Sequence, residues 1–152
     1  MTIREVSPEE FASLEEARKV IVHDHPRRYA VVELESGGGQ LGLCWRSDQI
    51  EPEIQPSPDR SLVWIGVDQR LSAVERASGK ARFSMNLEAP LLQFVADENF
   101  LVALTEIEAI VFNWEGSVRA TKELPELPDT AAIENRVLVV HLVDGQTVTL
   151  KF

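Results

Sequence analysis

Three segments of the chain share one pattern, and this pattern constrains the fold more than any other feature. Each begins at a leucine, continues as a short apolar run, passes a turn and enters a second run rich in Val, Ile or Leu. The leading residues are Leu62, Leu101 and Leu138, with spacings of 39 and 37 residues. Self-similarity at this period is typical of propellers and solenoids, in which neighbouring units bury each other's apolar faces. We therefore expect successive copies of one small β unit.

The repeated unit extends beyond its first hairpin. In the first two copies a glycine turn comes next, at Ser78-Gly79-Lys80 and at Glu115-Gly116-Ser117, and a further strand follows each turn. An acidic residue precedes the leading strand of every copy. The pattern predicts an antiparallel meander of up to four strands, with repeat-like units at residues 60–96, 97–134 and 135–152.

The N-terminal segment predicts one short helix. Ser7-Pro8-Glu9-Glu10 combines a capping serine, a proline in the first turn and a glutamate three residues after the serine. Phe11, Leu14 and Ala17 then recur at helical spacing. We expect an amphipathic helix over residues 8–18 that covers an open end or edge of a sheet.

Residues 28–59 predict a first hairpin and a proline-rich loop. Two strand-like runs, residues 29–35 and 41–46, flank the glycine-rich segment Ser36–Gln40, which favours a hairpin. This segment is not a phosphate loop, because no lysine followed by serine or threonine comes after it. Three prolines within residues 49–59 indicate a loop or an edge strand, since proline donates no backbone hydrogen bond.

The best copy of the repeat resembles a known family. Val63-Trp64-Ile65-Gly66-Val67-Asp68, then Leu71-Ser72-Ala73-Val74-Glu75, then Ser78-Gly79-Lys80-Ala81-Arg82-Phe83 is similar to the repeat of quinoprotein-type (PQQ-like) β-propellers. Glu75 stands where that repeat has aspartate, Ser78 where it has threonine and Phe83 where it has tryptophan. The match is best over residues 62–87. The resemblance implies a propeller-like fold and says little about activity.

The predicted fold class is all-β: a propeller-like antiparallel meander of about three four-stranded units with one short N-terminal helix. A complete propeller needs about four blades or more. Two arrangements would manage the remaining edges. The blades pack as an open meander capped by the helix, or two chains complete one ring and form a homodimer through sheet edges.

Length and composition set the limits on organisation and partners. With 152 residues the chain suits a single domain, 1–152, and its formal charge of −10 excludes a general nucleic-acid binder. There is no basic start followed by an apolar run, and no apolar stretch of the about 18 residues that a membrane span requires. With only one cysteine, Cys44, no internal disulfide is possible. We expect a cytoplasmic protein.

No motif indicates catalysis or a bound cofactor. His23 and His25 are two residues apart and, on an extended strand, would share a face and supply two metal ligands. The proline at position 26 instead favours a polar turn, so we expect no metal. Cys44 lies between a leucine and a tryptophan and is typical of a small buried hydrophobe. Trp45 and Trp64 indicate packing within sheets.

Acidic residues concentrate in residues 97–134, which hold nine acids and two bases. Such a segment speeds the capture of basic partners, although a solubility role alone would also fit. Trp114, beside a turn, is expected to be exposed and to serve recognition. The predicted partner-binding residues are Glu106, Glu108, Trp114, Glu115, Glu123 and Glu126.

These observations favour a non-enzymatic protein-binding module that captures a partner with a basic surface. Its most concrete form is an acidic inhibitor or bacterial immunity-type protein. One alternative is a small-ligand or metal-binding β module, with a pocket near the Ser36–Gln40 loop or at the His23-Asp24-His25 turn. Another alternative is a structural subunit of a larger assembly.

Overall fold

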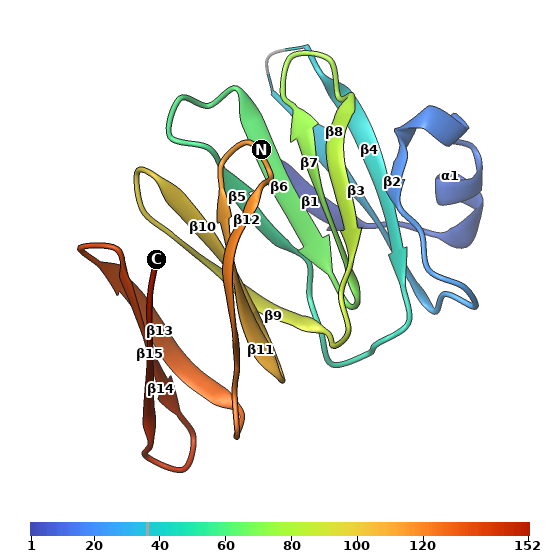
Figure 1. Ribbon diagram of the computed structural model, residues 1–152. Coiled ribbons are helices and arrows are strands. Elements are labelled where there is room, and N and C mark those ends of the chain that lie inside the picture. Colours follow the sequence, from blue (N-terminus) through green and yellow to red (C-terminus); the bar gives the residue numbers. More distant parts are fainter. Residues whose placement is uncertain (36) are drawn as a thin grey trace. The chain divides into compact units, whose positions relative to one another are not determined.

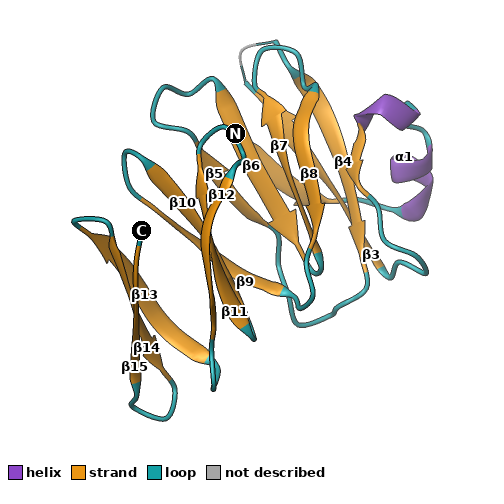
Figure 2. Cartoon of the chain, in the orientation of Figure 1, coloured by secondary structure: helices purple, strands orange, loops and turns teal. Residues whose placement is uncertain are grey.

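The computed structural model describes residues 1–35 and 37–152, and nearly every element in it is a β-strand (Figures 1 and 2). The helical elements are α1 (Pro8–Ala12) and the 3₁₀ turn η1 (Glu16–Arg18). The strands are β1 (Thr2–Glu5), β2 (Lys19–Ile21), β3 (Arg28–Leu34), β4 (Gly39–Trp45), β5 (Glu53–Pro56), β6 (Leu62–Val67), β7 (Arg70–Glu75), β8 (Ala81–Asn86), β9 (Leu91–Ala96), β10 (Phe100–Thr105), β11 (Glu108–Asn113), β12 (Val118–Glu123), β13 (Pro128–Glu134), β14 (Val137–Leu142) and β15 (Thr147–Lys151). The described helices are too short to cross a membrane. The all-β prediction is confirmed.

The chain divides into two compact units, Met1–Glu88 and Ala89–Phe152, called unit 1 and unit 2 below. Unit 1 holds two four-stranded sheets, ordered β1-β3-β4-β2 and β5-β6-β7-β8. Unit 2 holds the four-stranded sheet β12-β11-β10-β9 and the three-stranded sheet β13-β14-β15. Neighbouring strands are antiparallel except β2 and β4, which run parallel.

The first sheet of unit 1 includes two strands that the sequence pattern did not indicate. Strand β1 pairs with β3 along one edge, and β2 pairs with β4 along the other. Between them in the sequence the chain forms α1, which packs against a face of this sheet over its central strands β3 and β4. Phe11 of α1 lies with its ring centroid 5.3 Å from that of Tyr29. A Cβ on Gly42 would come within 3.0 Å of the Phe11 ring, so this glycine lets the helix approach the sheet.

The helix is also shorter than the predicted range 8–18. Ser7 caps it as expected, with its hydroxyl accepting a hydrogen bond from the Glu10 backbone N–H at 3.1 Å. Helix α1 nevertheless ends at Ala12, and the Ser13 hydroxyl donates to the Glu10 carbonyl at 2.7 Å. Serine side chains compete for backbone groups in this way, which weakens the interior of a helix. Residues 16–18 form only a 3₁₀ turn.

Both units contain a packed apolar core between their two sheets. In unit 1 the core combines β3 and β4 residues with β6 residues, including Val32, Leu43, Trp45, Val63 and Ile65, all fully buried. In unit 2 it combines β10 and β11 residues with β14 residues: Val102, Leu104, Val111, Leu138 and Val140. Strands β6, β10 and β11 read as continuous apolar runs because both of their faces are covered, whereas in β14 buried residues alternate with less buried ones.

The structure contains the repeat, but equivalent positions in its strands are offset by one residue from the alignment on the three leading leucines. Strands β6, β10 and β14 each come second in their sheets and begin at residues 62, 100 and 137, which gives periods of 38 and 37. Leu101 and Leu138 therefore correspond to Val63 and not to Leu62. Val63, Leu101 and Leu138 are all buried, whereas Leu62 is half-buried, as a one-residue slip in a strand requires.

Each sheet also begins one strand earlier than the predicted units. Strands β5, β9 and β13 start at residues 53, 91 and 128, ahead of the unit starts at 60, 97 and 135. The proline-rich segment, predicted to be either a loop or an edge strand, contributes the edge strand β5. First strands carry weaker patterns than the buried second strands, since they lie at sheet edges and are only partly covered.

Candidate functional site

The six residues predicted to bind a partner lie at opposite ends of one hairpin in unit 2. Glu108 and Glu123 face each other across β11 and β12. Glu106 lies in the turn before β11, and Glu126 lies in the link after β12. Trp114 and Glu115 lie in the turn at the other end, five or more residues further along β11, which is about 17 Å at 3.3 Å per residue. The structure thus brings four of the six residues together.

Trp114 is buried, contrary to the expectation that it is exposed. Its exposed fraction is 9%, and Trp45 and Trp64 are at 0%. A turn at Asn113 to Ser117, closed by the Asn113 side chain accepting from the Ser117 backbone N–H at 2.9 Å, holds the residue. A place in a turn puts the backbone of a residue at the surface, but its side chain can still point into the interior. All three indoles therefore belong to the packed interior, as aromatic residues in sheets usually do.

Three connections meet at the end of unit 2 that carries the four glutamates, at the bottom of the orange and red strands in Figure 1. The backbone N–H of Leu124 donates to the carbonyl of Ile107 at 2.8 Å, and that of Val143 donates to the carbonyl of Leu127 at 2.9 Å. These bonds join the β10–β11 turn, the β12–β13 link and the β14–β15 turn. We call the surface formed by Glu106, Ile107, Glu126, Leu127, Val143 and Asp144 the turn surface of unit 2.

The turn surface combines apolar side chains with acids. Ile107 is 44% exposed, Leu127 45% and Val143 56%. These are three of only six exposed large hydrophobic residues in the described part of the chain. Each of them adjoins an acid in the sequence: Glu106, Glu126 and Asp144 respectively. Sequence reasoning missed the apolar trio, although a signal was present, because Ile and Val are unusual in tight turns.

A second candidate site is a cavity of about 360 Å³ in unit 1. It lies where β2, β4 and β8 end and where the β6–β7 turn begins. Its lining residues are Val22, His23, Asp24, Arg46, Gln69, Arg70, Asn86 and Leu87. Two of them belong to the His23-Asp24-His25 turn, which was one of the two places where a ligand pocket was expected. His25 does not line the cavity.

His23 is a structural residue within this wall. It is 9% exposed, and its Nδ1 lies 2.8 Å from the Cys44 carbonyl oxygen, which can only accept a hydrogen bond. Nδ1 therefore carries the proton, and Nε2 accepts from the Gln69 backbone N–H at 3.2 Å. Both ring nitrogens are occupied, so His23 is not available as a metal ligand. Across the described residues, no three His, Cys, Asp or Glu side chains come together as a metal site.

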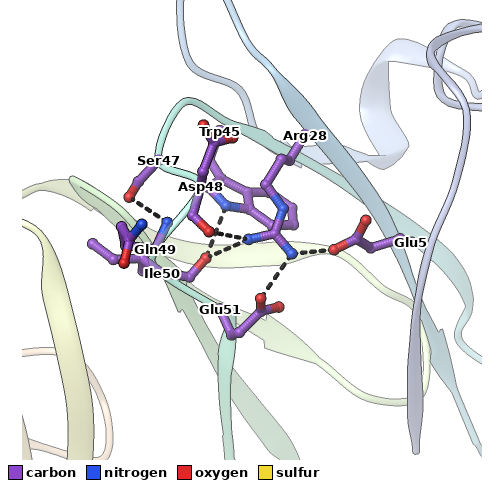
Figure 3. Close-up of polar contacts among 8 residues, drawn as sticks. All are labelled: Glu5, Arg28, Trp45, Ser47, Asp48, Gln49, Ile50 and Glu51. Carbon is purple, nitrogen blue, oxygen red and sulfur yellow. Dashed lines mark hydrogen bonds and ion pairs between the residues drawn. The ribbon is translucent and has the colours of Figure 1, made fainter.

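The loop that follows β4 is held by two sets of contacts. The buried Asp68 carboxylate accepts from the backbone N–H groups of Arg46 and Ser47 at 3.2 and 3.1 Å. Arg28 lies over the Trp45 ring at 4.9 Å and donates to the Ile50 carbonyl at 3.0 Å (Figure 3). Its guanidinium also contacts the carboxylates of Glu5 and Glu51. The loop is thereby fixed at both ends, which positions Arg46 at the cavity.

Neither remaining candidate shows a reactive arrangement. Cys44 is 1% exposed, and burial raises the pKa of its thiol, as expected for a small buried hydrophobe. In the Ser36–Gln40 segment, Ser36 lies outside the described residues. The Gly38 carbonyl there accepts from Arg18 Nη1 at 2.6 Å, and the same nitrogen donates to the Ser78 carbonyl at 3.3 Å. Arg18 therefore ties two hairpin turns of unit 1 together.

No protein-family model matches the chain, and no curated protein matches its sequence. Solved structures do match. The WD40 β-propeller domain of Doa1 matches 88% of this chain with a TM-score of 0.58 and 11% identity. The mitotic checkpoint complex matches 99% with a TM-score of 0.56 and 11% identity, and the computationally designed Ika8 protein matches 87% with a TM-score of 0.59 and 11% identity.

The matched length is only part of each of these structures. This chain spans 51% of the Doa1 domain, 50% of the mitotic checkpoint complex chain and 45% of Ika8. At 11% identity such a likeness shows the fold alone. The quinoprotein type of the repeat therefore stays a prediction. The sheets of this chain are propeller-like.

Proposed function

We propose that the protein is a non-enzymatic binding module that captures a basic partner protein through the turn surface of unit 2. The observation that carries the proposal is the exposed trio Ile107, Leu127 and Val143, set among acids at one end of the unit. Interfaces typically place apolar anchors at their centre and charged groups at their rim. The turn surface has this composition.

Charge supports a basic partner over other classes. Unit 2 contains ten acids and four bases, a formal charge of −6 in 64 residues. Around the trio lie Glu106, Glu126 and Asp144, and the directly opposed pair of Glu108 and Glu123 is close by. The negative field of the whole unit would speed the approach of a basic partner.

The finer form of the proposal is an inhibitor or immunity-type protein acting in the cytoplasm. The composition fits this role, because the chain is acidic and carries no catalytic motif, and an acidic protein can neutralise a basic enzyme by binding it. The turn surface supplies what this role needs: a rigid apolar centre held by backbone hydrogen bonds, with acids beside it. Fixed geometry lowers the entropic cost of association.

The test identifies partners first and maps the surface second. Immobilised protein is incubated with cell extract at 50 and 150 mM salt, bound proteins are identified, and each basic candidate is purified. Association and dissociation rates are then measured with the wild type, with Glu106→Lys plus Glu126→Lys, and with Ile107→Ala plus Leu127→Ala. The matched controls are Glu115→Lys and Val118→Ala, exposed residues at the other end of the β11–β12 hairpin.

Charge reversal should slow association about tenfold and flatten its dependence on salt, because rim charges act mainly on the association rate. The apolar truncations should instead speed dissociation. Both controls should bind like the wild type. If the controls weaken binding as much as the turn-surface variants, or if neither set changes it, the proposal fails. A partner enzyme whose activity falls on binding would support the inhibitor form.

A further inference from the structure

The cavity of unit 1 presents two arginines that lack a carboxylate partner. Arg46 and Arg70 both line it, and among the described residues neither guanidinium forms an ion pair. The only acid in the lining is Asp24, which is exposed. The cavity wall therefore carries a net positive charge within a protein of formal charge −10. A cleft lined by positive charge raises the local concentration of anions.

Arg70 is the more constrained of the two. It begins β7, where the backbone pairs it with Asn86 of β8, another lining residue. Its Nη1 donates to the Val22 carbonyl at 3.3 Å, while its Nε is buried and has no hydrogen-bond partner in the described structure. A buried donor without a partner is unfavourable, and more so on a charged group. A ligand oxygen bound to the same guanidinium would add a charge-assisted hydrogen bond and offset part of this cost.

Arg46 lines the same cavity but follows β4 of the first sheet, whereas Arg70 lies on β7 of the second sheet. The backbone of Arg46 is fixed by Asp68, and its side chain is exposed. The guanidinium group presents a planar set of donors that matches carboxylate and phosphate oxygens, often in pairs of parallel hydrogen bonds. Two such groups at one cavity select an oxyanion over a neutral or cationic group.

The rest of the lining restricts the ligand further. Both nitrogens of His23 are engaged, so His23 offers the ligand no free donor, and Gln69 Nε2 already uses one of its two hydrogens on the Glu88 carbonyl at 3.2 Å. The Asp24 carboxylate accepts hydrogen bonds and repels further negative charge. A volume of about 360 Å³ is at the small end of the usual range for ligand sites.

We propose that this cavity binds a small molecule through a single oxyanion, a carboxylate or a phosphate, held between Arg46 and Arg70. The remainder of the ligand carries an N–H or O–H group that donates to Asp24. The site lies in unit 1, and its residues are separate from the turn surface of unit 2. Its occupancy is thus an independent property of the chain.

The experiment is a nuclear magnetic resonance titration of the ¹⁵N-labelled full chain. The probes are inorganic phosphate and acetate, each compared with sodium chloride at equal ionic strength. The arginine Nε–H signals and the Gln69 and Asn86 amides are followed. We expect saturable shifts at these signals with a dissociation constant in the millimolar range for phosphate, acetate or both. Which probe binds separates the phosphate form from the carboxylate form.

Three variants and one control make the titration specific. Arg46→Gln and Arg70→Gln should each weaken binding at least tenfold. Asp24→Asn should tighten the binding of both simple anions several-fold by removing repulsion, an effect that a purely structural role for Asp24 would not produce. Arg82→Gln, on the exposed strand β8, removes the same charge outside the cavity and should leave binding unchanged.

Two results would overturn the proposal. One is that neither probe shifts the cavity signals beyond the chloride control at 20 mM. The other is that the arginine variants and Arg82→Gln bind equally, since binding would then be a diffuse charge effect. The same spectra report folding. If Arg70→Gln does not fold, Arg46→Gln and Asp24→Asn still decide the outcome, because both change exposed side chains.

Discussion

The Nε2 atom of His23 lies 3.2 Å from the backbone nitrogen of Gln69, 46 positions further along the chain. His23 follows β2 of the first sheet of unit 1, and Gln69 lies in the β6–β7 turn of the second sheet. Together with the bond from Nδ1 to the Cys44 carbonyl, this contact makes one imidazole a bridge between two sheets. His23 and Gln69, which this contact joins, both line the cavity.

The bridge predicts a large difference between two neighbouring histidines. His23→Ala should lower the free energy of unfolding by about 1–3 kcal/mol, because it leaves the Gln69 N–H and the Cys44 carbonyl without partners. His25→Ala, at an exposed position of the same turn, should change it by less than about 0.5 kcal/mol. Urea denaturation measures both. Equal effects from the two substitutions would show that the bridge contributes nothing particular.

Arg28 predicts a second contrast, between arginine and lysine. Its guanidinium lies over Trp45 and at the same time donates to the Ile50 carbonyl and contacts Glu51 (Figure 3). Lysine keeps the charge but cannot make the planar set of contacts. Arg28→Lys should therefore lower the free energy of unfolding by about 1–2 kcal/mol.

The control for Arg28 is its neighbour. Arg27 is exposed, and its guanidinium forms an ion pair with the Asp48 carboxylate at 3.5 Å. Arg27→Lys should be neutral within about 0.5 kcal/mol, since exposed ion pairs contribute little. Thermal unfolding of the two variants beside the wild type gives the comparison. A neutral Arg28→Lys would mean that charge alone, and not geometry, fixes the loop after β4.

The fold could be predicted from the sequence where strands carry a strong apolar pattern. The runs beginning at Leu62 and Leu101 lie in β6 and β10, which are buried on both faces, and the run beginning at Leu138 lies in β14, which is buried on one face. Strands β1 and β2 were missed because Thr2–Glu5 is exposed along its length and Lys19–Ile21 is only three residues long. Their pairing depends on β3 and β4, which is a tertiary effect.

The candidate sites were predictable only in part. Charge counting located the acidic half of the chain, but it could not show that Glu106 and Glu115 lie at opposite ends of a hairpin. Arg46 and Arg70 carried no signal at all, since they are 24 positions apart and no motif links them. Cavities form where distant turns converge, so their linings follow from topology and not from local pattern.

The two glycines of the first hairpin turn predict opposite tolerances. Gly37 has φ +84° and nothing within 4 Å of where a Cβ would be, whereas a Cβ on Gly38 would lie 2.1 Å from the Arg76 carbonyl oxygen. Gly37→Asn should be nearly neutral, because asparagine tolerates positive φ. Gly38→Asn should cost about 1–3 kcal/mol by forcing the backbone apart. Chemical denaturation distinguishes them, and similar losses would contradict the close approach.

Asp59 predicts how stability depends on pH. Its Oδ1 accepts from the Ser61 backbone N–H at 2.9 Å and from the hydroxyls of Ser57 and Ser61 at 2.7 and 2.8 Å, and these bonds hold the pKa of the carboxyl below its ordinary 3.8. A pKa lowered by folding adds stability above the unfolded value, and this stability is lost as pH falls through the folded value. The wild type should therefore exceed Asp59→Asn in stability at pH 7, and the gap should close as the solution is acidified below pH 3.8. Ser61→Ala removes the hydroxyl donor but keeps the backbone donor, so it should lower the stability at pH 7 by less than Asp59→Asn does. Denaturant unfolding from pH 7 to pH 2.5 measures the gap, and a gap that is constant with pH would contradict the assignment.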